Sequence, residues 1–252
     1  MPHALCLLKF AIRNPKSEIT KLPAASCSLP AISFASRKEI VVLFYYRING
    51  SLTVGGPWFR FVVERAPTGI LLKSSKAFPP SHPTTKMCLR LMLQDLKQRP
   101  CQDLVDVGCG SGILALAGLK LGVKRAVAVD LDLRAIITSR ENAELNHLEQ
   151  KLLLVKGSTE AVDGSFDLVL ANLPMPVLRE KLPELLRLSR SGGSLVLSGF
   201  QDLDRYVLEK ELSSQGLSAN SWLSQDLVFF GVPPTGSFTW MAVLVQREGH
   251  KA

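Results

Sequence analysis

Three glycines alternate in the stretch LVDVGCGSGI, which covers residues 104–113. They are Gly108, Gly110 and Gly112, and Asp106 stands two residues before the first of them. An apolar run precedes the glycines and a helix-forming run follows them, which predicts a tight turn between a strand and a helix. At such a turn a ligand can lie against bare backbone amides at the helix N-terminus, where a side chain would obstruct it. The loop is therefore interpreted as a cradle for a cofactor.

The spacing of the glycines favours one class of cofactor. Dinucleotide sites use G-x-G-x-x-G to place a pyrophosphate at the helix N-terminus, whereas this loop reads G-x-G-x-G. The carboxylate of Asp106 is poorly placed for a pyrophosphate and well placed for an ammonium group. Asp130 lies 18 residues beyond Gly112, where an acid can accept hydrogen bonds from both ribose hydroxyls. Asp130 could also cap the next helix, as could Asp132. Together these residues favour S-adenosylmethionine (AdoMet) over a nicotinamide cofactor.

The elements that must position these residues begin at Asp103, from which strands and helices alternate. Apolar strand candidates cover residues 103–107, 125–130, 151–156, 166–172 and 193–200, and helical stretches cover residues 112–122, 131–146, 176–190 and 201–215. Such strands joined by crossover helices indicate a parallel sheet covered on both faces. Two more strand candidates, 218–230 and 238–247, are joined by a turn and could form an antiparallel edge. The predicted fold class is α/β, with a doubly wound, mostly parallel, seven-stranded Rossmann-like sheet.

The front of the chain is predicted to be a small β-rich segment. Two strand-like runs within residues 39–54 flank Asn49 and Gly50, a pair that suits a type I′ hairpin turn because both residues tolerate positive φ. Residues 58–64 and 69–73 are interpreted as further short strands.

A Pro-rich loop and a helix connect this segment to the alternating part, and Thr84 or Thr85 can cap the helix. We therefore predict a substrate-recognition segment at 1–73 and an AdoMet-binding domain at 74–252. Residues 1–65 contain nine Lys or Arg and three Asp or Glu, a balance of +6 within a net charge of +8 for the chain. Such a surface suits a polyanion or an acidic protein, and a solvated basic face explains it equally well.

Composition narrows the protein class. The 252 residues are 46% hydrophobic, enough for a sizeable core. No apolar run approaches the roughly 18 residues that span a bilayer, so no membrane association is expected. The five cysteines lack C-x-x-C pairs and the four histidines lack H-x-x-x-H spacing, so neither a disulfide framework nor a metal site is expected. We expect a cytoplasmic protein, although the acid-poor first forty residues would also suit a transit peptide.

The chain resembles the class I AdoMet-dependent methyltransferases and, among them, the PrmA-type ribosomal-protein lysine methyltransferases. The resemblance is carried by SHPTTKMCL, DVGCGSGILALAGLKLG, AVDLD with ENAELN, KGSTEA, FDLVLANLPMPVL and SGGSLVLSGF. It covers about residues 76–247 and implies the fold described above, with AdoMet as the cofactor. Phe78 to Ser81 replace a glycine-bearing loop of the family, and Met175 stands where amide methyltransferases have an aromatic residue.

The resemblance also implies roles for individual side chains. Asp106 and the loop from Gly108 to Gly112, with Cys109 and Gly110 inside it, would hold the methionine end of AdoMet. Asp130 would contact the ribose, Ser158 the adenine edge, and Thr84 and Thr85 the cofactor from above the sheet. Leu131 is predicted to contact the cofactor as well. Asn172 would face the methyl group and the acceptor nitrogen, and is the predicted catalytic residue.

Three functions stay open at this point. The favoured one is N-methylation of a lysine or amino group of a protein, such as a ribosomal protein. The second is methylation of RNA or a small molecule through the basic front, with candidate contacts at Tyr45, Tyr46, Arg47, Trp58 and Arg60. The third is a non-catalytic AdoMet-binding module, which the intact glycine loop disfavours.

Overall fold

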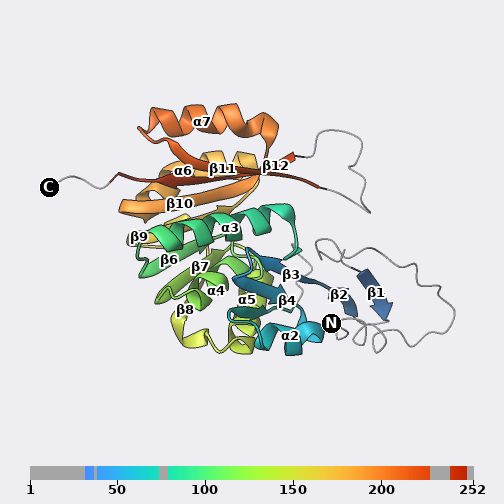
Figure 1. The fold of residues 1–252 in the computed structure, drawn as a ribbon. Coiled ribbons are helices and arrows are strands. Elements are labelled where there is room, and N and C mark those ends of the chain that lie inside the picture. The colour runs from blue at the N-terminus through green and yellow to red at the C-terminus, as the bar shows by residue number, and fades with distance from the viewer. Residues whose placement is uncertain (1–31, 37–38, 74–78, 228–238, 249–252) are drawn as a thin grey trace.

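The computed structural model describes residues 32–36, 39–73, 79–227 and 239–248. Its centre is a seven-stranded sheet with strand order β11-β12-β10-β9-β6-β7-β8 (Figure 1). The strands are β6 (Asp103–Val107), β7 (Arg125–Asp130), β8 (Leu152–Lys156), β9 (Phe166–Asn172), β10 (Ser189–Gln201), β11 (Ala219–Asp226) and β12 (Thr239–Gln246). Strands β10, β9, β6, β7 and β8 pair in parallel, and β12 is antiparallel to both neighbours. The predicted doubly wound, mostly parallel sheet is confirmed, with β12 inserted between β10 and β11.

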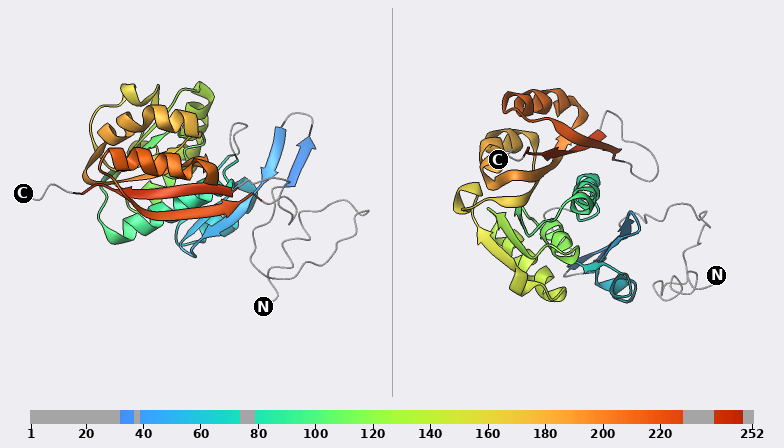
Figure 2. Two further views of the ribbon diagram at one scale, coloured as in Figure 1. Left: turned by 90° about the horizontal axis from the view of Figure 1, so that it is seen from above. Right: turned by 60° about the vertical axis from the view of Figure 1, so that its left-hand side comes forward.

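Alternate residues of each strand face opposite sides of the sheet, so the apolar strands bury both faces. Leu104 belongs to the hydrophobic cluster shared with α3, α4 and α5, whereas the next residue, Val105, packs with α6 and α7. The two groups of helices cover opposite faces (Figure 2). The helices are α3 (Pro83–Gln98), α4 (Ile113–Lys120), α5 (Leu133–Leu145), α6 (Met175–Leu188) and α7 (Arg205–Ser214). Among the described residues, no helix combines the length and apolar character needed to cross a bilayer.

A second, three-stranded sheet precedes the central one, with β3 (Tyr45–Ile48), β4 (Leu52–Gly55) and β5 (Gly69–Leu71). The predicted turn at Asn49 and Gly50 is confirmed: both have positive φ, 48° and 69°, and the Ser51 amide donates to the Ile48 carbonyl at 3.0 Å. Ahead of this sheet, β1 (Ile32–Ser36) and β2 (Glu39–Leu43) form an antiparallel pair.

The strand predicted at residues 58–64 is wrong. Those residues lie mostly in a 3-10 turn, η1 (Pro57–Phe59), and a short helix, α2 (Arg60–Glu64). Pro57 suits the first position of a helix because its fixed φ is helical and it has no amide to leave unpaired. The alternating sequence resembled a strand, yet Val63 is the one buried residue of the two elements, and Arg60 pairs with Glu64 at 2.7 Å at helical spacing.

The small sheet packs directly against the central domain. Buried side chains of β3, β4 and β5 share one hydrophobic cluster with α3 and α4, among them Tyr46, Val54 and Ile70. The domain boundary after residue 73 stays a prediction, and the two predicted parts share a core.

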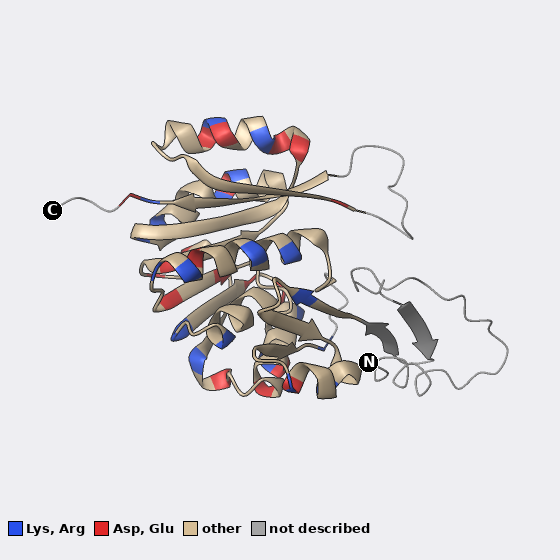
Figure 3. Ribbon diagram, in the orientation of Figure 1, with Lys and Arg blue, Asp and Glu red and all other residues tan. Residues whose placement is uncertain are grey.

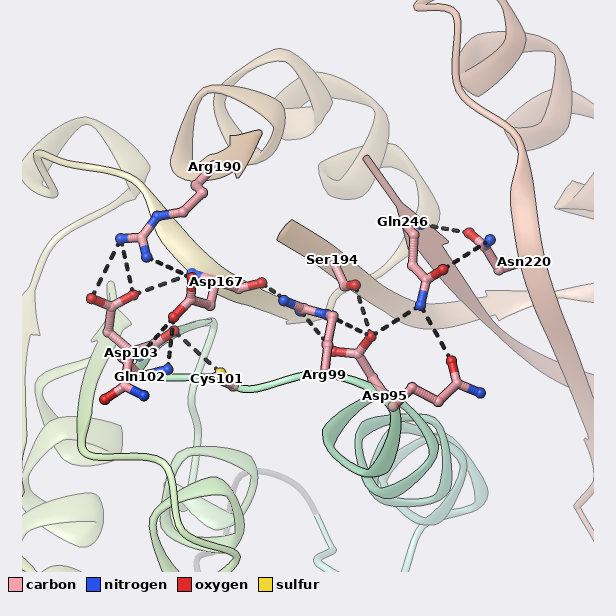
Figure 4. A network of polar contacts seen from close by, with 11 residues as sticks. Asp95, Arg99, Cys101, Gln102, Asp103, Asp167, Arg190, Ser194, Asn220 and Gln246 are labelled. Atoms are coloured by element: carbon pink, nitrogen blue, oxygen red, sulfur yellow. Dashed lines mark hydrogen bonds and ion pairs between the residues drawn. The ribbon is translucent and has the colours of Figure 1, made fainter. Parts of the chain in front are cut away.

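A polar network closes the amino ends of the strands (Figure 4). Asp95 of α3 is fully buried and accepts two hydrogen bonds from Arg99, at 2.9 and 2.7 Å, and one from Ser194 of β10 at 2.8 Å. Arg99 also donates to the backbone carbonyl of Asp167 in β9 at 2.6 Å. These contacts fix α3 against the sheet. Most other charged side chains lie on the helices, and the central strands carry few (Figure 3).

Candidate active site

A cavity of about 320 Å³ opens at the carboxyl ends of β6, β7 and β9, a size in the range of small-molecule sites. This edge is where open α/β sheets bind their ligands. Nine of the eleven predicted site residues line it: Thr85, Asp106, Gly108, Cys109, Gly110, Asp130, Leu131, Ser158 and Asn172. The other two, Thr84 and Gly112, are not among the residues that line it.

The glycine loop forms the floor of this cavity. Gly108, Gly110 and Gly112 all have positive φ, between 55° and 76°, which disfavours any residue with a side chain. A Cβ at Gly108 would lie 2.5 Å from the Leu173 side chain, whereas a Cβ at Gly110 would meet nothing within 4 Å. The floor is therefore tightly packed at Gly108 and open at Gly110.

Two carboxyl groups face the cavity from β6 and β7. Asp106 is 1% exposed and accepts a hydrogen bond from the Ala115 amide at 3.2 Å. Burial, with a smaller contribution from the charge of Asp130, raises its pKa to about 7 against the lowering effect of the Ala115 hydrogen bond. The two oxygens of Asp130 accept from the amides of Gly110 and Asp132, each at 2.9 Å. Among the described residues, neither Asp106 nor Asp130 has a Lys, Arg or His partner within 4.0 Å. The cavity is thus suited to a cationic ligand.

Asn172 ends β9, the strand next to β6, and also lines the cavity. Its backbone is fixed, because Asn172 pairs with Ser198 of β10 and the next amide, Leu173, donates to the Ser198 carbonyl at 2.9 Å. Gly199 permits this turn, since a Cβ there would lie 2.3 Å from the Leu173 carbonyl oxygen. The side-chain oxygen of Asn172 is buried and has no hydrogen-bond partner within the described part of the chain. A buried carbonyl without a donor is costly, which indicates that a ligand supplies the donor.

The N-terminal end of α3 forms the roof. The cap predicted at Thr84 or Thr85 is wrong: His82 is the cap, and its side chain accepts from the Thr84 amide at 3.3 Å. Pro83 then takes the first helical position, which sets the phase of the helix. Thr85 faces the cavity, while the Thr84 hydroxyl contacts His82 Nδ1 at 2.8 Å. Burial, with the charge of Lys86, lowers the pKa of His82 to about 4.

Several cavity residues escaped the sequence analysis. Pro80, Ser111, Leu173, Val177 and Lys181 all line the wall. Ser111 was covered by the predicted loop from Gly108 to Gly112 but was not selected as a site residue by itself. Leu173, Val177 and Lys181 depend on how α6 crosses the end of β9, which no local pattern encodes.

Asp130 and Asp132 were both candidates to cap the helix that follows β7. Asp132 caps α5 and accepts from the Arg134 amide at 2.9 Å, which leaves Asp130 at the cavity wall. Within the described residues, no three His, Cys, Asp or Glu side chains gather as metal ligands. Cys6, Cys27, His3 and His250 lie outside the described residues.

Comparison with known proteins identifies the family. The sequence model described as ribosomal protein L11 methyltransferase (PrmA) matches residues 47–226, most of the chain. The chain belongs to this family. The match begins within β3, so it includes the three-stranded sheet as well as most of the central sheet.

Curated relatives named ribosomal protein L11 methyltransferase are similar to part of the chain. The ribosomal protein L11 methyltransferase of Photobacterium profundum is 40% identical over 173 residues, 66% of this chain and 58% of the relative. That of Thiobacillus denitrificans is 46% identical over 119 residues, 47% of this chain and 38% of the relative. The chain spans about half the length of the curated relatives it matches.

Solved structures agree on the fold. The ribosomal protein L11 methylase of Lactobacillus delbrueckii subsp. bulgaricus superposes with a TM-score of 0.67 at 28% identity, covering 81% of this chain and 98% of that one. A precorrin-8W decarboxylase of Methanobacterium thermoautotrophicum matches with a TM-score of 0.53 at 21% identity, over 69% of this chain and 96% of that one, and shares the fold alone.

Proposed function

We propose that this chain is an AdoMet-dependent methyltransferase that N-methylates a lysine or amino group of a protein, with ribosomal protein L11 as the first candidate. The observation that carries the proposal is the buried, unpartnered carboxamide oxygen of Asn172, in a cavity that two carboxylates and a glycine loop also line. The names of the PrmA relatives support the acceptor class.

The cavity fits AdoMet by the chemistry of its donors and acceptors. Asp106 would hold the ammonium group of the methionine end, and the open space above Gly110 would admit the cofactor close to the backbone. Asp130 would accept from the ribose hydroxyls in addition to its two amide donors. The roles assigned to Thr84, Thr85, Cys109, Leu131 and Ser158 stay predictions.

AdoMet, when bound, would supply a methyl group on a positively charged sulfonium, and S-adenosylhomocysteine would leave as a neutral thioether when an amine nitrogen takes the methyl group in line. The protein then has to orient an uncharged amine and exclude water. Freeing a lysine of its proton at pH 7 costs about 4 to 5 kcal/mol when its pKa is about 10.4. The Asn172 oxygen would accept a hydrogen bond from the amine N–H and so direct its lone pair toward the methyl group. The proton is lost to water before transfer.

The RNA alternative has less support from the front segment. Of the side chains predicted to contact RNA, Tyr46 is 3% exposed and Arg60 is paired with Glu64. Trp58, at 73% exposed, is open to a partner, and Arg47 is exposed as well. The cytoplasmic location stays a prediction.

Labelled AdoMet provides the test. The chain is incubated with methyl-labelled AdoMet and either L11 or ribosomal RNA, and the product is treated with protease or nuclease. Label in L11 that protease releases, and that Asn172→Ala nearly abolishes, is the expected result. Label in RNA would favour the second function, and AdoMet binding without transfer to L11 or to RNA would favour a binding module.

A further inference from the structure

Helix α5 and its C-cap residue carry three buried polar side chains: Ser139 and Asn142 in the helix and Asn146 at the C-cap. Their spacing of three and four residues aligns them along the helix. They are 0%, 0% and 5% exposed, so each needs hydrogen-bond partners. None of the three was selected by sequence analysis as a site residue.

Asn146 completes the free edge of the three-stranded sheet. Its side-chain oxygen accepts from the Leu71 amide at 2.9 Å, and its side-chain nitrogen donates to the Leu71 carbonyl at 2.6 Å. The carboxamide thereby takes the place of a neighbouring strand beside β5, so the sheet is hydrogen-bonded to α5 as well as packed against the core.

Asn142 extends this connection to the floor of the cavity. It accepts from the Lys73 amide at 2.7 Å, just beyond β5, and donates to the Ser111 carbonyl at 2.9 Å. Ser111 belongs to the glycine loop and lines the cavity. Ser139 supports the same loop by donating to the Gly110 carbonyl at 3.1 Å. One buried carboxamide therefore joins the small sheet to the loop.

Tyr46 makes the equivalent connection to the roof. It lies in β3, is 3% exposed, and its hydroxyl donates to the Pro80 carbonyl at 2.8 Å. Pro80 also lines the cavity. Burial raises the pKa of Tyr46, so the hydroxyl keeps its proton and remains a donor. The small sheet is thus hydrogen-bonded to two walls of the cavity.

We infer that Asn142 and Tyr46 are positioning residues that couple the three-stranded sheet to the cofactor cavity. This inference rests on the proposed function, because it assigns the cavity to AdoMet. The coupling is reciprocal: whatever stabilises the sheet holds the loop in its binding shape, and a cofactor on the loop stabilises the end of β5. The sheet then contributes to cofactor affinity although none of its own strands lines the cavity.

Isosteric variants test the floor and the roof separately. Asn142→Asp replaces the donor to Ser111 with an oxygen, and Tyr46→Phe removes only the hydroxyl. We expect the AdoMet dissociation constant, measured by calorimetry on the full chain, to rise about tenfold in Asn142→Asp and about threefold in Tyr46→Phe. Both variants lose one buried hydrogen bond, and Asn142→Asp also sets a carboxylate oxygen against the Ser111 carbonyl oxygen. Ser194→Ala is the matched control, because it loses a buried 2.8 Å hydrogen bond to Asp95 at the opposite edge. It should lower the melting temperature and leave affinity within twofold.

Hydrogen exchange supplies a measurement that needs no ligand. In the ligand-free chain, Asn142→Asp should speed exchange at the Gly110 amide, although the variant keeps the oxygen that accepts from the Lys73 amide, while Ser194→Ala leaves both amides unchanged. Adding AdoMet to the wild type should slow exchange at the Lys73 amide. Wild-type affinity in both Asn142→Asp and Tyr46→Phe, or no change at Gly110, would overturn the coupling. A wild type that binds no AdoMet would instead refute the proposed function, and the ligand-free exchange would still decide the coupling.

Discussion

A buried carboxyl group gives this cavity its own pH response. The pKa of Asp106 is raised from 3.8 to about 7 in the folded chain, chiefly by burial. The folded state therefore holds this proton more tightly, and the stability it contributes is full below about pH 4 and lost as the pH rises through about 7. We expect Asp106→Asn to gain stability relative to the wild type across that window, by about 4 kcal/mol at pH 8. Urea unfolding at a series of pH values measures the difference, and a constant difference would contradict a buried, titrating Asp106.

The same group should control cofactor binding. If its ionised form holds the ammonium group, AdoMet affinity should fall close to tenfold per pH unit below about pH 7. Calorimetry on the wild type and on Asp130→Asn checks this. Asp130→Asn should bind AdoMet more weakly overall but show the same dependence of affinity on pH. If the AdoMet affinity of the wild type did not change with pH, Asp106 would not be the group that holds the ammonium.

Asn172 is proposed to act in methyl transfer, so a variant at this position should slow transfer without changing AdoMet binding. With a lysine acceptor, the single-turnover rate at subsaturating acceptor should rise close to tenfold per pH unit from about 6.5 to 8.5, as the neutral amine fraction grows. Asn172→Ala should depress that rate by about 10- to 100-fold with little change in AdoMet affinity, because it loses one hydrogen bond to the nucleophile. A wild-type single-turnover rate that does not change with pH would favour an amide or nucleobase acceptor.

At the scale of elements, the glycine loop can be tested against another glycine of similar conformation. Gly110 and Gly216 have φ of 55° and 70°, and a Cβ at either would meet nothing within 4 Å. Alanine at each should lower the free energy of unfolding by about 1 kcal/mol through left-handed strain. Gly110→Ala alone should also weaken AdoMet binding, since its methyl group enters the cavity. Equal affinity in the two variants would show that the open space above Gly110 is not used.

The network beneath α3 should matter for stability and little for binding. Arg99→Ala leaves the fully buried Asp95 without its cation, and we expect a loss of about 3 to 5 kcal/mol in the free energy of unfolding. Arg125→Ala, which removes the 78% exposed partner of Asp103, should cost below about 1 kcal/mol. Chemical denaturation of both variants gives the comparison, and similar small losses would mean that water reaches Asp95.

Sequence could specify those parts of the site that are local in the chain. Asp106, the glycines and Asp130 follow one strand–loop–helix–strand path, so spacing alone brings them to one edge. It could not decide between Thr84 and Thr85, because the phase of α3 depends on a cap at His82.

The same limit explains the strand that was misassigned. Alternating apolar residues at 58–64 fit a strand, and the helix found there depends on Pro57 and on packing through Val63. No spacing in the sequence predicts that Lys181 lines the cavity, since it lies two turns into α6.

At the scale of the whole molecule, the shared core limits where the chain can be shortened. A chain that begins at Gly69 would lack β3 and β4, whose buried side chains belong to the cluster that holds α3 and α4. We expect that chain to unfold at a much lower denaturant concentration, whereas one that begins at Glu39 should keep the cooperative transition. Cofactor binding by a folded chain from Gly69 would contradict this and would favour the separate recognition segment predicted at 1–73.

The position of β12 sets an order of events during synthesis. Strand β10 ends at Gln201 and β12 ends at Gln246, so 45 further residues must be made before the gap between β10 and β11 can be filled. At about 5 to 20 residues per second, the nascent chain spends about 2 to 9 seconds with an unpaired edge on β10. Unpaired edges invite pairing with other chains. Every newly made copy therefore passes through a brief period in which its central sheet is open beside β10, and a chaperone that shields strand edges would act then.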